Sequence, residues 1–104
     1  VEICRRAKHP AVWIMADFFH MHIEETSSPR ALRRAGKFIR HCHLADNTRQ
    51  EPGTGDINFV SAFRALRAVG FDGYMAYECG ISGPDKAASL ARSLEFVRGC
   101  LTRV

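Results

Sequence analysis

The sequence predicts an α/β fold built from parallel βα units. Three short apolar runs each end at a polar residue, and the segments between them carry apolar residues at helical spacing. The polar ends of these runs lie 26 and 35 residues apart, which is the spacing of strands separated by helices. Two architectures of this class remain open at this stage: a doubly wound sheet and part of an eight-stranded βα barrel.

The first half of the chain is expected to hold two helices and two strands. A helix over residues 1–9 ends at a proline, because the residue before proline disfavours the helical conformation. The apolar run 11–16 predicts a strand buried on both faces, with Trp13 in the core. A helix over residues 26–36 has proline in its first turn and ends at a glycine. Residues 38–45 form the second predicted strand.

The second half begins with a polar loop at residues 48–56, which contains one proline and two glycines. A helix over residues 56–70 follows, because its apolar residues recur at i, i+4, i+7 and i+10. A turn leads into a third strand at residues 74–77, and a last helix covers residues 84–100. The predicted order of elements is therefore α-β-α-β-α-β-α.

Composition narrows the class of protein. Hydrophobic residues make up 46% of the chain and charged residues 25%, a balance typical of a globular domain. No apolar run approaches the roughly 18 residues of a membrane-spanning helix, so no membrane partner is expected. The four cysteines include no Cys-x-x-Cys pair, which disfavours a zinc site and a disulfide framework. Because the first residues show no secretory signal, we expect a reducing, cytoplasmic location.

The net charge could favour nucleic acid as a partner, but the distribution of the basic residues does not. Fifteen Lys and Arg residues against eleven Asp and Glu residues give a formal charge of +4. The basic residues are dispersed along the predicted helices, which is typical of solvated helix faces rather than of a phosphate-binding stripe.

Three polar residues end the three predicted strands: Asp17, His43 and Glu78. The carboxyl edge of a parallel sheet is where ligands bind and catalytic residues gather. Two carboxylates and one imidazole suit a divalent ion such as Mn²⁺, Mg²⁺ or Co²⁺. Singly, each residue has a plainer explanation as a helix cap, a core histidine or a solvated strand end, but their shared position favours the metal site. His41 faces the same side as His43 and is expected to line the interior.

Longer motifs surround these three residues. They are Asp17-Phe18-Phe19-His20-Met21 with Ile23-Glu24-Glu25, then His41-Cys42-His43-Leu44-Ala45-Asp46-Asn47-Thr48-Arg49 with Pro52-Gly53-Thr54-Gly55-Asp56, and finally Gly70-Phe71-Asp72-Gly73-Tyr74 leading to Glu78. In type and order they resemble the xylose isomerase-like sugar isomerases and epimerases. The resemblance implies that residues 1–104 form a single partial TIM-barrel domain. This would be an incomplete barrel of about three strands, the C-terminal portion of a (β/α)8 TIM barrel.

The resemblance also implies roles for single residues. Asp17, His43 and Glu78 would bind the divalent metal (Mn²⁺, Mg²⁺ or Co²⁺), and His20 and Arg49 would contact substrate oxygens. Glu78 would be one of two catalytic glutamates that move a proton next to a carbonyl, through a cis-enediolate, on a ketose, an aldose or a related hydroxy-carbonyl compound. The second glutamate, also a metal ligand, belongs to an earlier strand of the family. Metal binding by the isolated chain is therefore expected to be weakened or lost.

Three alternatives to a sugar isomerase or epimerase stay open. The first is a catalytically incomplete, truncated fragment that acts as an oligomeric or binding scaffold. The second is a DNA-repair endonuclease of a related metal-dependent barrel group, which would need more metal ligands. The third is a helical-bundle interaction protein, which the short apolar runs disfavour. The predicted open three-stranded sheet has two unpaired edges, so a homo-oligomer is expected.

Overall fold

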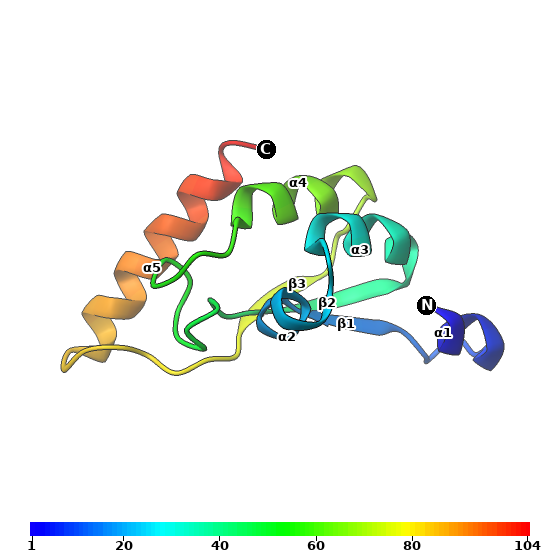
Figure 1. Ribbon diagram of the computed structural model, residues 1–104, viewed down its shortest axis with the longest axis horizontal. Coiled ribbons are helices and arrows are strands. Elements are labelled where there is room, and N and C mark those ends of the chain that lie inside the picture. Colours follow the sequence, from blue (N-terminus) through cyan, green and yellow to red (C-terminus); the bar gives the residue numbers. More distant parts are fainter.

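A three-stranded parallel sheet forms the centre of the computed structural model, which describes residues 1–104 (Figure 1). Its strands are β1 (Ile14–Asp17), β2 (Ile39–Leu44) and β3 (Tyr74–Tyr77), and they lie side by side in the order β1-β2-β3. Both strand pairs are parallel. The predicted arrangement of parallel βα units is thus confirmed.

The pairing register decides which side chains share a face of the sheet. Met15 pairs with His41, and His41 pairs with Tyr74. Two residues further along, Asp17 pairs with His43. Because side chains alternate along a strand, all five residues lie on the same face of the sheet. The intervening residues face the helices instead.

Five α-helices and one 3₁₀ turn complete the fold. They are α1 (Glu2–Ala7), α2 (Phe18–Glu24), α3 (Ser28–Ala35), η1 (Gly36–Phe38), α4 (Phe59–Ala68) and α5 (Lys86–Leu101). Helices α3 and α4 lie over one face of the sheet, α5 packs beside α4, and α1 stands at the far end beside β1 (Figure 1). None of these helices combines the length and the apolar character needed to cross a bilayer.

Side-chain caps fix where the longer helices begin. Ser27 accepts a hydrogen bond from the backbone N–H of Arg30 at the start of α3, and Asp85 accepts one from Ala88 at the start of α5. Asn58 does the same for α4 through Ser61. These short polar residues satisfy amide groups that have no partner inside the helix.

The core lies between the sheet and the helices. The rings of Phe18, Phe59 and Phe63 pack together with their centroids 5.8 to 6.0 Å apart. Cys42 and Leu44 of β2 are fully buried against this cluster. Burial of large aromatic rings against aliphatic side chains is a main source of stability in a domain of this size.

Two expectations about the first strand and its surroundings were wrong. The strand begins at Ile14 and not at residue 11, and Trp13 is 41% exposed instead of lying in the core. Its ring is covered by the Arg40 guanidinium, whose Cζ lies 4.1 Å from the ring centroid. The elements also include α2 and η1, which the predicted order lacks.

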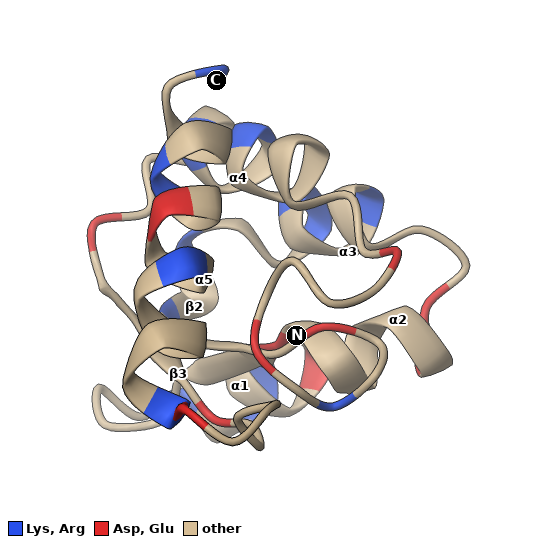
Figure 2. Cartoon of the chain, turned by 90° about the vertical axis from the view of Figure 1, so that its left-hand side faces the viewer, with Lys and Arg blue, Asp and Glu red and all other residues tan.

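Charged residues are spread over the surface. In the view of Figure 2, Lys and Arg occupy separate positions on α3, α4 and α5, with acidic residues between them. No single basic stripe runs across this side of the molecule.

Candidate metal centre

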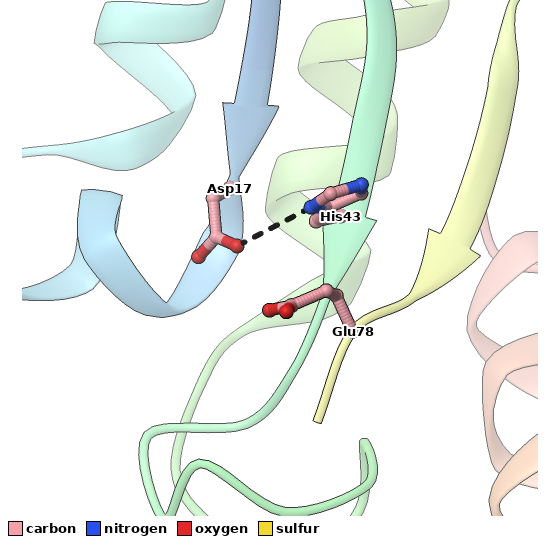
Figure 3. Close-up of side chains that lie close together, drawn as sticks. All are labelled: Asp17, His43 and Glu78. Atoms are coloured by element: carbon pink, nitrogen blue, oxygen red, sulfur yellow. Dashed lines mark ion pairs between the residues drawn. The ribbon is translucent and has the colours of Figure 1, made fainter.

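The carboxyl ends of the three strands bring Asp17, His43 and Glu78 together (Figure 3). One ligand atom from each side chain lies within 4.8 Å of the other two. The sheet register explains this convergence. Asp17 pairs directly with His43, and the N–H of Glu78, one residue beyond β3, donates to the Leu44 carbonyl at 3.1 Å.

Asp17 serves the fold and the site with different oxygen atoms. Its Oδ1 accepts a hydrogen bond of 2.9 Å from the backbone N–H of His20 and so caps α2. Its Oδ2 lies 3.8 Å from Nδ1 of His43, which is longer than a hydrogen bond. The helix cap therefore leaves one oxygen of this buried carboxylate directed at the other two residues (Figure 3).

The donor set fits a divalent cation. Donors bound to one small cation at about 2.1 Å stand about 3 to 4 Å apart, so a set within 4.8 Å needs only small side-chain rotations. Two carboxylates and one imidazole match the preferences of borderline and hard divalent ions. Three protein donors also leave coordination positions open for a substrate or for a further ligand.

The two residues expected to contact substrate lie beside one aromatic ring. The Arg49 Cζ lies 4.9 Å from the centroid of the Phe19 ring, and the His20 ring lies 5.2 Å from it in an edge-on arrangement. Both His20 and Arg49 are exposed. The structure thus brings them to the same end of the sheet as the three possible metal ligands, on α2 and on the loop after β2 (residues 45–58).

Asp46 is a residue whose role the sequence did not reveal. It is buried, and its carboxylate accepts hydrogen bonds from the N–H groups of Asn47, Gly53 and Ile57 at 2.8 to 3.1 Å. These bonds fold the loop after β2 around a single side chain. The only signal in the sequence is an acidic residue directly after a strand and before a glycine-rich loop.

Glu51 was also missed, and here the sequence carries no signal, because a single glutamate in a polar loop is ordinary. It is only 3% exposed, and its carboxylate accepts hydrogen bonds from the N–H and the hydroxyl of Ser82. Burial on its own would raise the pKa of Glu51. The bonds from Ser82 and the charge of Lys86 outweigh this and hold the pKa below its usual range.

Comparisons with known proteins agree with this architecture. Residues 1–100 match the xylose isomerase-like TIM barrel family. The chain is 40% identical over 89 residues to 3-dehydro-D-guloside 4-epimerase of Escherichia coli (strain K12), a match that covers 86% of this chain and 34% of that enzyme. It is 37% identical over 78 residues to D-psicose 3-epimerase of Ruminiclostridium cellulolyticum, covering 75% of this chain and 27% of the enzyme.

Solved structures give the same result. The apo crystal structure of 3-keto-D-glucoside 4-epimerase from E. coli superposes with a TM-score of 0.89 at 37% identity, over 93% of this chain and 37% of that one. D-psicose 3-epimerase from Clostridium cellulolyticum H10, solved with D-tagatose, gives 0.86 at 29% identity, over 97% and 42%. The chain spans about a third of the length of these relatives. With its family match over residues 1–100 and its three barrel strands, the chain belongs to the xylose isomerase-like TIM barrel family.

Proposed function

We propose that this chain is the metal-binding and proton-transferring part of a sugar epimerase or isomerase, with a ketose, an aldose or a related hydroxy-carbonyl compound as substrate. The observation that carries the proposal is the meeting of Asp17, His43 and Glu78 at the carboxyl edge of the sheet, with donor atoms within 4.8 Å. The relatives support the substrate class, since those most similar in sequence are named as sugar epimerases.

Asp17, His43 and Glu78 would hold the divalent ion, for which Mn²⁺, Mg²⁺ and Co²⁺ are the candidates. When bound, such an ion supplies Lewis-acid polarisation of the carbonyl and hydroxyl oxygens of a sugar. Asp17 is fixed for this task because its other oxygen caps α2. Glu78 is more exposed and lies just past the end of β3, so its carboxylate has room to reach a substrate.

Glu78 is the proposed catalytic carboxylate. A carboxylate at this position can take the proton from the carbon next to a carbonyl, and a second carboxylate can return a proton to the opposite face. Asp17, the other carboxylate of this cluster, is assigned to the metal and to the cap of α2, and the cluster contains no third carboxylate. We therefore propose that the second one comes from the remainder of a barrel, and that the chain alone does not complete the reaction.

His20 and Arg49 are the proposed substrate-binding residues. The Arg49 guanidinium lies over the Phe19 ring of α2, with its Cζ 4.9 Å from the ring centroid, and this contact holds it beside the residue that follows Asp17 and Phe18. A guanidinium there can stabilise the negative charge that develops on a substrate oxygen when the proton leaves. The His20 imidazole offers a hydrogen bond to a second oxygen.

Calorimetric titration with Mn²⁺ tests the proposal. Because the second glutamate ligand belongs to an earlier strand, we expect weak but saturable binding of about one ion per chain, and loss of that binding in Asp17→Ala. Asp17→Asn is the sharper variant, because an asparagine oxygen can still cap α2 while the charge toward the metal is gone. It should weaken Mn²⁺ binding at least about 10-fold with an unchanged far-ultraviolet circular dichroism spectrum.

Two results would contradict the proposal: no saturable Mn²⁺ binding by the unmodified chain, or equal binding by Asp17→Asn. Either result would favour the alternative function, that of a catalytically incomplete fragment acting as an oligomeric or binding scaffold. Asp56→Asn is the matched control. It removes an exposed carboxylate from the loop after β2 and should leave Mn²⁺ affinity unchanged.

A further inference from the structure

The loop after β2 and the segment after β3 (residues 78–85) are joined through Glu51. Both oxygens of its carboxylate are used: Oε2 accepts from the backbone N–H of Ser82 at 2.8 Å, and Oε1 accepts from the Ser82 hydroxyl. Glu51 forms no ion pair with any Lys, Arg or His. The hydrogen bonds of this buried carboxylate to Ser82 tie together two segments whose joined residues are 31 positions apart in the sequence.

The backbone continues this connection toward the metal centre. Gln50 and Gly80 form an isolated parallel bridge, and the Gly80 N–H donates to the Arg49 carbonyl at 3.1 Å. On the other side of this bridge, the Glu78 N–H donates to the Leu44 carbonyl at 3.1 Å. The segment that carries Glu78 is therefore fastened to the segment that carries Arg49 at successive points, of which Glu51 with Ser82 is the outermost.

Arg49 itself sits in a conformation that needs such support. Its φ is +61°, in the left-handed region that side-chain-bearing residues seldom adopt. A residue is kept there only when the surrounding structure holds it. The Gly80 bond to its carbonyl and the Arg49 N–H bond of 2.9 Å to the Asp46 carbonyl provide this hold.

We propose that Glu51 is a positioning residue, which keeps Arg49 and Glu78 at a fixed separation by clamping the loop after β2 to the segment after β3 through Ser82. The inference rests on the proposed function, since it assigns a task to Arg49 and Glu78. The inference goes beyond that function because Glu51 itself would contact neither the metal nor the substrate.

The neighbouring bonds show why a carboxylate is needed at this position. In the structure the Ser82 N–H and hydroxyl both donate to the Glu51 carboxylate, which accepts twice. Glutamine could accept from the Ser82 N–H, but its amide group would turn the Ser82 hydroxyl into an acceptor, and both charge-assisted bonds would be replaced by weaker neutral ones. The lowered pKa of Glu51 agrees with an ionised, doubly accepting side chain at neutral pH. Pro52 next to it is held separately, because the Ser93 hydroxyl donates to its carbonyl at 2.6 Å.

Glu51→Gln tests the clamp in two ways that do not depend on turnover. In amide hydrogen exchange, we expect faster exchange at Gly80 and Ser82, while the amides of β2 keep their protection. In Mn²⁺ calorimetry, we expect an affinity about 10-fold lower than that of the unmodified chain, because Glu78 is no longer held in place. Ser82→Ala keeps the backbone donor and loses the hydroxyl, so its effect should be smaller in both measurements.

A double-mutant cycle separates positioning from a general loss of structure. If Glu51 acts through Glu78, then Glu51→Gln lowers Mn²⁺ affinity less in a Glu78→Gln background than in the unmodified chain. An equal loss in both backgrounds would overturn the inference. Unchanged Mn²⁺ affinity in Glu51→Gln would also overturn it, while leaving the proposed function intact. Failure of the unmodified chain to bind Mn²⁺ would overturn both, and Asp56→Asn serves again as the matched control.

Discussion

Cys42, in the middle of β2, is fully buried, and this burial raises the pKa of its thiol from an ordinary value of 9.0 to about 12. In the unfolded chain the thiol would ionise near 9.0, whereas in the folded protein it stays protonated until about pH 12. The stabilising contribution is therefore complete below pH 9.0 and decreases as the pH rises toward 12. We expect the free energy of unfolding to fall over this range.

Urea unfolding at a series of pH values between 7 and 10.5 checks this expectation. Cys42→Ala removes the titrating group, so its stability should fall less steeply above pH 9 than that of the unmodified chain. Some alkaline loss should remain, because burial also raises the pKa values of Tyr77, Cys79 and Cys100. Parallel curves for the two proteins would show that Cys42 does not carry the effect.

At the scale of single residues, the sequence predicts which side chains meet at the ends of the strands. It does not predict the role of a side chain whose partner lies on another loop. Asp17, His43 and Glu78 could be placed at one edge because parallel strands end at the same edge. Glu51 could not be assigned a role, because its partner Ser82 lies 31 residues away and on another loop. Trp13 was placed wrongly in the core because it belongs to an apolar run that begins outside the sheet.

The loop after β2 depends on Gly55 for a steric reason. A Cβ atom at this position would lie 2.0 Å from Oδ1 of Asn47 and 2.6 Å from Oδ1 of Asp46. Both oxygens already accept backbone hydrogen bonds within the loop. We expect Gly55→Ala to lower the free energy of unfolding by about 1 to 3 kcal/mol.

Gly99→Ala is the matched control for this substitution. Gly99 lies within α5, and a Cβ atom there would meet nothing within 4 Å. Alanine favours helix over glycine by up to about 1 kcal/mol, so this variant should be as stable as the unmodified chain or more stable. Thermal unfolding of both variants, followed by circular dichroism, compares them. Equal effects of the two substitutions would contradict the steric role of Gly55.

At the scale of elements, hydrophobic periodicity identifies the helices and strands that are long or strongly apolar. Strand β3 was predicted at its observed bounds, and β2 within one residue at each end. Helix α2 was missed because it has only seven residues, too few for a clear period. It is held by tertiary packing, since Phe18 at its start packs against Phe59 and Phe63. Such packing is not visible in a local sequence pattern.

At the scale of the whole molecule, the sheet has one covered face and one open face. The open face carries Met15 and Tyr74 on either side of His41, and their exposed fractions are 48% and 84%. Strands β1 and β3 each pair on one side only. A cavity of about 420 Å³ along β1, lined mainly by apolar side chains such as Ile14 and Leu32, continues this unpaired surface. In a barrel, neighbouring strands would cover these surfaces.

Unpaired strand edges beside an exposed apolar face favour association, so we predict that the isolated chain forms homo-oligomers. Light scattering coupled to size-exclusion chromatography should give a mass well above the 11.7 kDa of one chain. Tyr74→Lys places a charge on the open face and should shift the mass toward that of the monomer. Ile23→Lys is the control, because Ile23 is 62% exposed on α2 and not on the sheet. A stable monomer at every concentration would contradict the prediction. It would mean that the open face of the sheet stays exposed to solvent and does not drive association.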